Sequence, residues 1–99
     1  MIRHIVAFRL SSTDPAERAE QSTGIHDHLT ALVGVVPGLI RMDVAPDLGV
    51  VDTHFHVVLV SEHDDATALA QYQAHPSHVE ASAWVGQFVA ERAIVDYEL

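Results

Sequence analysis

Four short apolar segments without glycine or proline occur along the chain, and each is typical of a β-strand. The first is the richest in β-branched and aromatic residues. The second alternates, so Ile40, Met42 and Val44 are expected on one face, with charged residues on the other. In the last, Ala93, Val95, Tyr97 and Leu99 share a face. The four expected strands are residues 2–10, 39–45, 53–61 and 91–98.

Helical patterns separate the first two strands and the last two. The first helix has Asp14 as N-cap and Pro15 at its first position, and it ends at Pro37-Gly38. Its apolar stripe, with spacings of one, three or four, is Ile25, Leu29, Leu32, Val33 and Val36. The second helix starts at Asp64-Asp65, is interrupted by Pro76, and continues from about residue 77 to residue 88.

The order strand, helix, strand, strand, helix, strand predicts one α+β domain over residues 1–99. This is the ferredoxin-like βαββαβ arrangement, with a four-stranded antiparallel sheet and both helices on one face. A chain of 99 residues is long enough to bury one core and too short for two.

Two of the expected strands are apolar on both sides, which the helices alone do not explain. Ile5 to Phe8 and Val57 to Val60 contain no polar residue, yet the helices cover only one face of the sheet. Burying four or five aliphatic side chains on the other face contributes roughly 1.5–3 kcal/mol each. We therefore expect a homodimer, a dimeric α+β barrel whose two sheets face each other around a small, largely apolar, histidine-bearing cavity. The alternatives are a monomer with an exposed apolar patch and a partner of different sequence.

The amino-acid composition limits which kinds of molecule the protein is expected to bind and where it is expected to be located. Five basic and fourteen acidic side chains give a formal charge of −9, which disfavours nucleic acid and anionic membrane surfaces as partners. The chain has no cysteine, no leader-like N-terminus and no apolar run near the ~20 residues of a membrane span. These features predict a cytoplasmic protein.

Eight histidines are the most conspicuous chemical feature. The spacing of His54 with His56, and of His75 with His78, would suit a metal, but no carboxylate stands in a fixed motif beside them. We expect no metal site and no cofactor. The remaining assignments are these: His26 and His28 solvated, His63 structural or exposed at a strand end, His75 bonded to a local backbone carbonyl, and His4 either a core or a cavity group.

Three segments together resemble one known family. Residues 2–9, the Tyr-x-x-His-Pro-x-His segment within residues 72–79, and Val95-Asp96-Tyr97 are similar to the Dabb family, the stress-responsive dimeric α/β-barrel proteins. The resemblance covers nearly the whole chain. It implies the same fold and the same dimer that the strand pattern predicts.

The family includes a plant polyketide cyclase that closes a linear tetraketide by aldol condensation. The resemblance implies that its catalytic tyrosine and histidine correspond to Tyr72 and His78. A histidine can remove a proton between two carbonyls, while a phenol hydrogen-bonds the oxyanion that develops. A third-strand histidine of the cyclase cavity corresponds to Val57 here, and only the neighbouring His56 is close enough to replace it.

These observations lead to three functional hypotheses. The first is a dimer that binds a small apolar oxygenated molecule, with cyclase or other aldol-type chemistry as its activity. Its candidate catalytic residues are His78 and Tyr72, and its candidate ligand-binding residues are His4, Val6, Phe8, Val57 and Trp84. The second is a non-catalytic, stress-responsive structural dimer, and the third is a monooxygenase of the wider superfamily. The first requires a pocket of roughly 300 Å³ or more on which His78 and Tyr72 converge.

Overall fold

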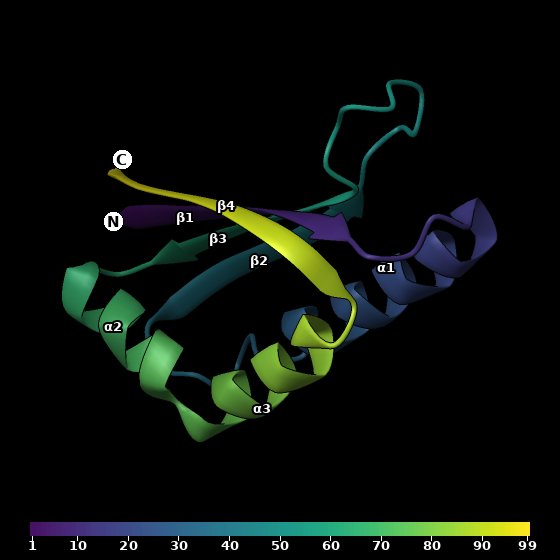
Figure 1. Cartoon of the computed structure of the whole chain (residues 1–99). Helices are drawn as coiled ribbons and strands as arrows, with labels where there is room; N and C mark the ends of the chain where they lie inside the picture. Colours follow the sequence, from purple (N-terminus) through teal and green to yellow (C-terminus); the bar gives the residue numbers. More distant parts are fainter.

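A single four-stranded antiparallel sheet with helices on one side makes up the computed structural model, which describes all 99 residues (Figure 1). The strands lie in the order β2-β3-β1-β4, so the chain has the predicted ferredoxin-like βαββαβ fold. The elements are β1 (Ile2–Leu10), α1 (Pro15–Thr30), β2 (Leu39–Pro46), β3 (Val57–His63), α2 (Ala66–Ala74), α3 (Pro76–Gly86) and β4 (Val89–Glu98).

Local sequence signals account for where the helices start and break. The Asp14 carboxylate accepts a hydrogen bond from the Ala16 amide at the start of α1. Pro76 lacks the amide hydrogen that a continuous helix needs, so the second helix is divided into α2 and α3. His75 caps α3 by accepting a hydrogen bond from the Ser77 amide at 3.1 Å. The expectation that its partner is a backbone carbonyl was therefore wrong.

Several expected boundaries shift. α1 ends at Thr30 rather than at Pro37, and residues 31–36 form turns. These turns still bury Val36 in the core. β3 begins at Val57, so His54 and His56 lie in the preceding loop and not on a strand. Ile40 was wrongly assigned to the same face as Met42 and Val44. The pairing register with β3 shifts between Leu39 and Arg41, which leaves Ile40 exposed.

The two faces of the sheet are both apolar at their centre. Alternate residues of β1 and β3, such as Val6 and Leu59, point toward the helices and are buried in the core. The opposite face, which we call the open face, has no helix over it (Figure 1). Its apolar centre is formed by Ile5, Ala7, Val58, Val60, Ala93 and Val95, which the pairing register places side by side.

Charged side chains surround that apolar centre and pair with one another. Arg3 and Arg41 both contact Glu62, at 3.0 and 3.4 Å. Arg9 pairs with Glu91 at the other end of the face. The predicted two-sided apolar character of β1 and β3 is thus confirmed, with an ionic rim around the uncovered side. None of the helices is long and apolar enough to cross a membrane.

Candidate active site

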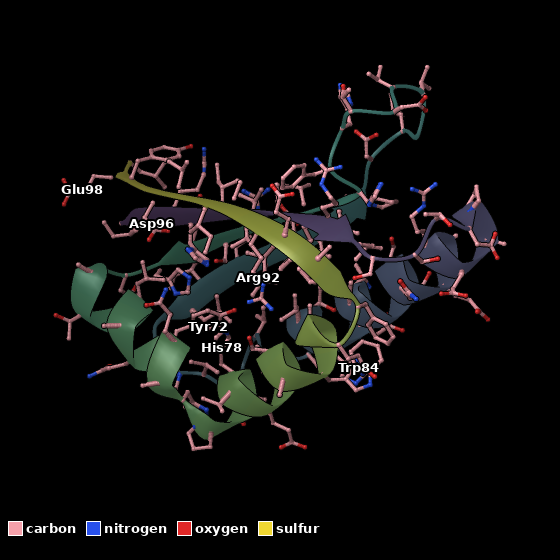
Figure 2. All side chains as sticks on the ribbon, in the orientation of Figure 1. Tyr72, His78, Trp84, Arg92, Asp96 and Glu98 are labelled. Atoms are coloured by element: carbon pink, nitrogen blue, oxygen red, sulfur yellow. The ribbon has the colours of Figure 1, made fainter.

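A cavity of about 140 Å³ lies between the helix-facing side of the sheet and the layer formed by α2 and α3. Tyr72 and His78 line it from the helices and Arg92 lines it from β4 (Figure 2). His4 of β1 is also part of the lining. The strand residues that line it lie on the covered side of the sheet. Alternation along β1 points His4 toward the chain's own helices, so this histidine-lined cavity lies on the covered side of the sheet, and a chamber between two facing sheets stays a prediction.

Tyr72, one of the residues that line this cavity, has an unpaired hydroxyl. The residue lies in the last turn of α2, is almost completely buried, and its hydroxyl has no hydrogen-bond partner in the protein. Burial raises the pKa of the Tyr72 phenol well above its usual value, so the group keeps its proton and is a hydrogen-bond donor. Leaving a buried hydroxyl unpaired costs about 1–3 kcal/mol. The Tyr72 hydroxyl could therefore donate a hydrogen bond to an acceptor atom of a ligand.

The imidazole of His78 packs against the Tyr72 ring and has one ring nitrogen without a partner in the protein. Its ring lies 4.3 Å from that of Tyr72, and its Nδ1 donates a hydrogen bond to the Gln73 carbonyl at 3.1 Å. The proton is thus on Nδ1, and Nε2 of the neutral ring carries a lone pair. Burial lowers the pKa of His78, against a smaller opposing effect of the Gln73 carbonyl. At neutral pH His78 is an uncharged base.

Two further histidines lie behind Tyr72. His4 bonds through Nδ1 to the carboxylate of Asp96, its cross-strand neighbour on β4. His4 is therefore a buried group with a polar partner that also lines the cavity, and both roles considered from the sequence remain compatible with its position. His63 is fully buried, contacts the Ser61 hydroxyl at 2.9 Å, and packs 4.8 Å from the Tyr72 ring. Burial lowers the pKa of His63 as well.

The structure gathers five of the seven sequence-predicted site residues: His78, Tyr72, His4, Val6 and Phe8. Val57 faces the helices and is buried, but it lies outside the cavity. Trp84 is also outside, because its indole stacks on His28 of α1 at a ring distance of 3.7 Å. Including Val57 and Trp84 among the cavity residues was wrong.

His56 does not replace the missing third-strand histidine. Its ring accepts a hydrogen bond from the Leu10 amide and contacts the Arg18 guanidinium at 2.9 Å, away from the cavity. His54 bonds to Asp47 in the same loop. No three histidine or carboxylate side chains are grouped so as to hold a metal ion.

Two site residues, Arg92 and Asp96, have no counterpart in the sequence-based prediction. Both alternate with the apolar residues Ala93 and Val95 along β4, so they point to the covered side of the sheet. Pairing β4 against β1 in antiparallel register would have placed Asp96 opposite His4 and Arg92 opposite Phe8. That register depends on the tertiary structure.

The fold and this cavity define a ferredoxin-like α+β domain with a small site between sheet and helices. The family model of the Stress responsive A/B Barrel Domain, Dabb, matches residues 2–99, and the chain belongs to this family. No curated protein has a sequence significantly similar to this one.

Solved structures support the same assignment. A dimeric ferredoxin-like protein of unknown function from Thermobifida fusca is 30% identical, with a TM-score of 0.82 over 99% of this chain and 90% of that one. A dimeric protein of ferredoxin-like fold and unknown function from Bacteroides fragilis is 26% identical, with a TM-score of 0.88 over 99% and 95%. A hydroxynitrile lyase from Passiflora edulis shares the fold at 18% identity, with a TM-score of 0.79 over 99% and 92%.

Proposed function

We propose that this protein is a homodimer in which each chain's cavity catalyses proton transfer at a carbon next to a carbonyl group of a small molecule. The observation that carries the proposal is the pairing of two complementary groups in one cavity. The Tyr72 hydroxyl is buried without a partner, and His78 beside it has a free Nε2. One is a donor for an oxyanion and the other a base.

The step balances with these two groups alone. His78 Nε2 takes a proton from the α-carbon, the C–H electron pair forms the C=C bond of the enolate, and the carbonyl π pair moves to oxygen. The Tyr72 hydroxyl donates a hydrogen bond to that oxygen. The enolate then regains the proton from His78 at carbon, or it attacks the carbonyl carbon of a second molecule, whose oxygen receives the π pair and takes the proton from His78; either path restores the neutral imidazole.

The size of the cavity restricts the substrate. Its 140 Å³ is smaller than the roughly 300 Å³ that the first hypothesis required, and it corresponds to about five water molecules at ~30 Å³ each. We therefore propose a ligand the size of a small ketone or oxo acid. Apolar walls such as Val6, Leu59 and Val85 suit a short aliphatic chain.

The dimer rests on the open face. An apolar centre with a rim of paired charges is the usual anatomy of a protein–protein interface. Val95 alone is 61% exposed in the single chain, and its neighbours on the face are also aliphatic. The related proteins from Thermobifida fusca and Bacteroides fragilis are dimeric. A second copy of this chain is the proposed occupant.

Hydrogen–deuterium exchange at the α-carbon of butanone, followed by NMR in D₂O, tests the catalytic proposal. We expect exchange above the solvent rate, a loss of about 10²–10⁴-fold in His78→Ala, and a dimer that stays intact. Tyr72→Phe should lower the rate as well. His26→Ala is the matched control, because His26 is exposed on α1 and contacts only Asp27 through its ring.

The outcomes separate the hypotheses. Exchange that persists unchanged in His78→Ala removes His78 from the mechanism. Exchange at the solvent rate in the native protein contradicts the catalytic proposal and leaves the non-catalytic structural dimer as the function.

A further inference from the structure

Arg92 brings a positive charge to the cavity. It lies on β4, on the side of the sheet that faces the helices, and its side chain projects into the space next to His78 (Figure 2). Its guanidinium lies 5.6 Å from the centre of the Phe8 ring. An added Cβ on Gly86, the last residue of α3, would lie 3.4 Å from Arg92 Nη2. Arg92 is an exposed residue, and its guanidinium thus lies at the mouth of the cavity, near the Phe8 ring and the end of α3.

Arg92 differs from every other cation of the chain in having no polar partner. The chain has five basic residues, all arginine, against fourteen acidic ones. Arg3, Arg9 and Arg41 form ion pairs with carboxylates, and Arg18 contacts His56. Arg92 makes no side-chain hydrogen bond and no ion pair. In so acidic a protein, an arginine without a carboxylate partner suggests that its anion comes from outside.

The surroundings keep that guanidinium available. The cavity lining contains no aspartate or glutamate. Asp96, on the same face of β4, is four residues away, about 13 Å at the ~3.3 Å rise of a strand, and it is bonded to His4. A guanidinium binds a carboxylate through two parallel hydrogen bonds. An anion bound there would lie beside His78 and Tyr72, within the reach of one small molecule.

We infer that the ligand of this cavity is a small aliphatic carboxylate, a short oxo acid in the reacting case, and that Arg92 binds its carboxylate group. The inference names the substrate class of the proposed site, so its catalytic part rests on the proposed function. The binding part does not. Arg92 is here a specificity-determining residue, while the base and the oxyanion donor remain His78 and Tyr72.

NMR titration of the ¹⁵N-labelled protein with isobutyrate and with isobutyramide tests the inference. The two probes have the same shape and number of heavy atoms, and only the acid is charged at pH 7. In 150 mM NaCl we expect isobutyrate to bind at least tenfold more tightly than the amide. Arg92→Gln should remove that preference and Arg92→Lys should restore part of it. Arg18→Gln, which removes one positive charge outside this cavity, should leave it unchanged.

Each result decides the point. Equal binding of acid and amide, binding unaffected by Arg92→Gln in a variant with native unfolding behaviour, or no isobutyrate binding up to 50 mM overturns the inference. Inorganic phosphate that binds as tightly as isobutyrate overturns the carboxylate class. Carboxylate binding without α-proton exchange contradicts the proposed function alone, whereas exchange of a neutral ketone without carboxylate preference contradicts this inference alone.

Discussion

The two faces of the sheet are built from the same strands but differ in where their polar groups lie. On the covered face, side chains such as Val6 and Leu59 pack under the helices, and polar groups are buried among them. On the open face, Ile5 and Val58 contribute to an equally apolar centre, but the charged groups stand at the rim and pair with one another. Buried polar groups around a cavity suit chemistry, whereas an apolar centre with an ionic rim suits assembly.

The largest expected effect is on the open face. Val95→Asp places a carboxylate at its apolar centre, and we expect the dimer to dissociate at least 100-fold more readily, about 2.7 kcal/mol. Sedimentation velocity over a concentration series measures the change. Ile94→Asp is the control, because Ile94 is equally exposed on the same strand but faces the helix side. A dimer that resists Val95→Asp would show that the subunits meet elsewhere.

A smaller effect of opposite sign is expected on the covered face. Tyr72→Phe removes a buried hydroxyl that has no partner, so the free energy of unfolding should rise by about 1 kcal/mol while α-proton exchange falls. Urea denaturation gives the first quantity. Tyr97→Phe on the open face is the comparison, since its half-exposed hydroxyl accepts a hydrogen bond from Arg3 at 2.8 Å. That variant should be neutral or slightly less stable. A loss of stability in Tyr72→Phe would mean that the hydroxyl is satisfied.

The smallest effect is a dependence of stability on pH. Burial lowers the pKa of His63, so the unfolded chain takes up a proton near pH 6.5 and the folded chain only at lower pH. The contribution of His63 is thus fully present above pH 6.5 and is lost as the pH falls through the folded-state value. Urea midpoints between pH 7.5 and pH 5 should decline less steeply in His63→Gln. His26→Gln, at an exposed site, should decline like the native protein, and identical slopes in all three would exclude His63 as the source.

Most of the architecture was predictable because it depends on local signals. The caps at Asp14 and Asp65, the break at Pro76 and the apolar character of β1 each act within a few residues. The predictions were wrong where the pairing with a neighbouring strand decides which side of the sheet a residue faces or where a strand begins. Ile40 does not share a face with Met42 and Val44, because the β2–β3 register shifts. His54 and His56 precede β3 and are not part of it.

For the site, the resemblance to the family pointed to Tyr72 and His78, and the structure places both in one cavity with His4. The pattern of residues did not indicate Arg92, because alternation alone does not show that the side of β4 carrying this exposed arginine borders a cavity. Its position depends on β4 pairing with β1 and on the helices that reach over that edge.

By itself the sequence determined the order of elements, the helix break and the excess of apolar surface that two short helical segments cannot cover. These follow from side-chain periodicity and from local backbone chemistry, which act over a few residues. Only the tertiary structure decided which side of the sheet holds the cavity and which polar groups meet in it. Those facts depend on strand register and helix docking, which bring together His4, Tyr72 and Arg92 from distant parts of the chain.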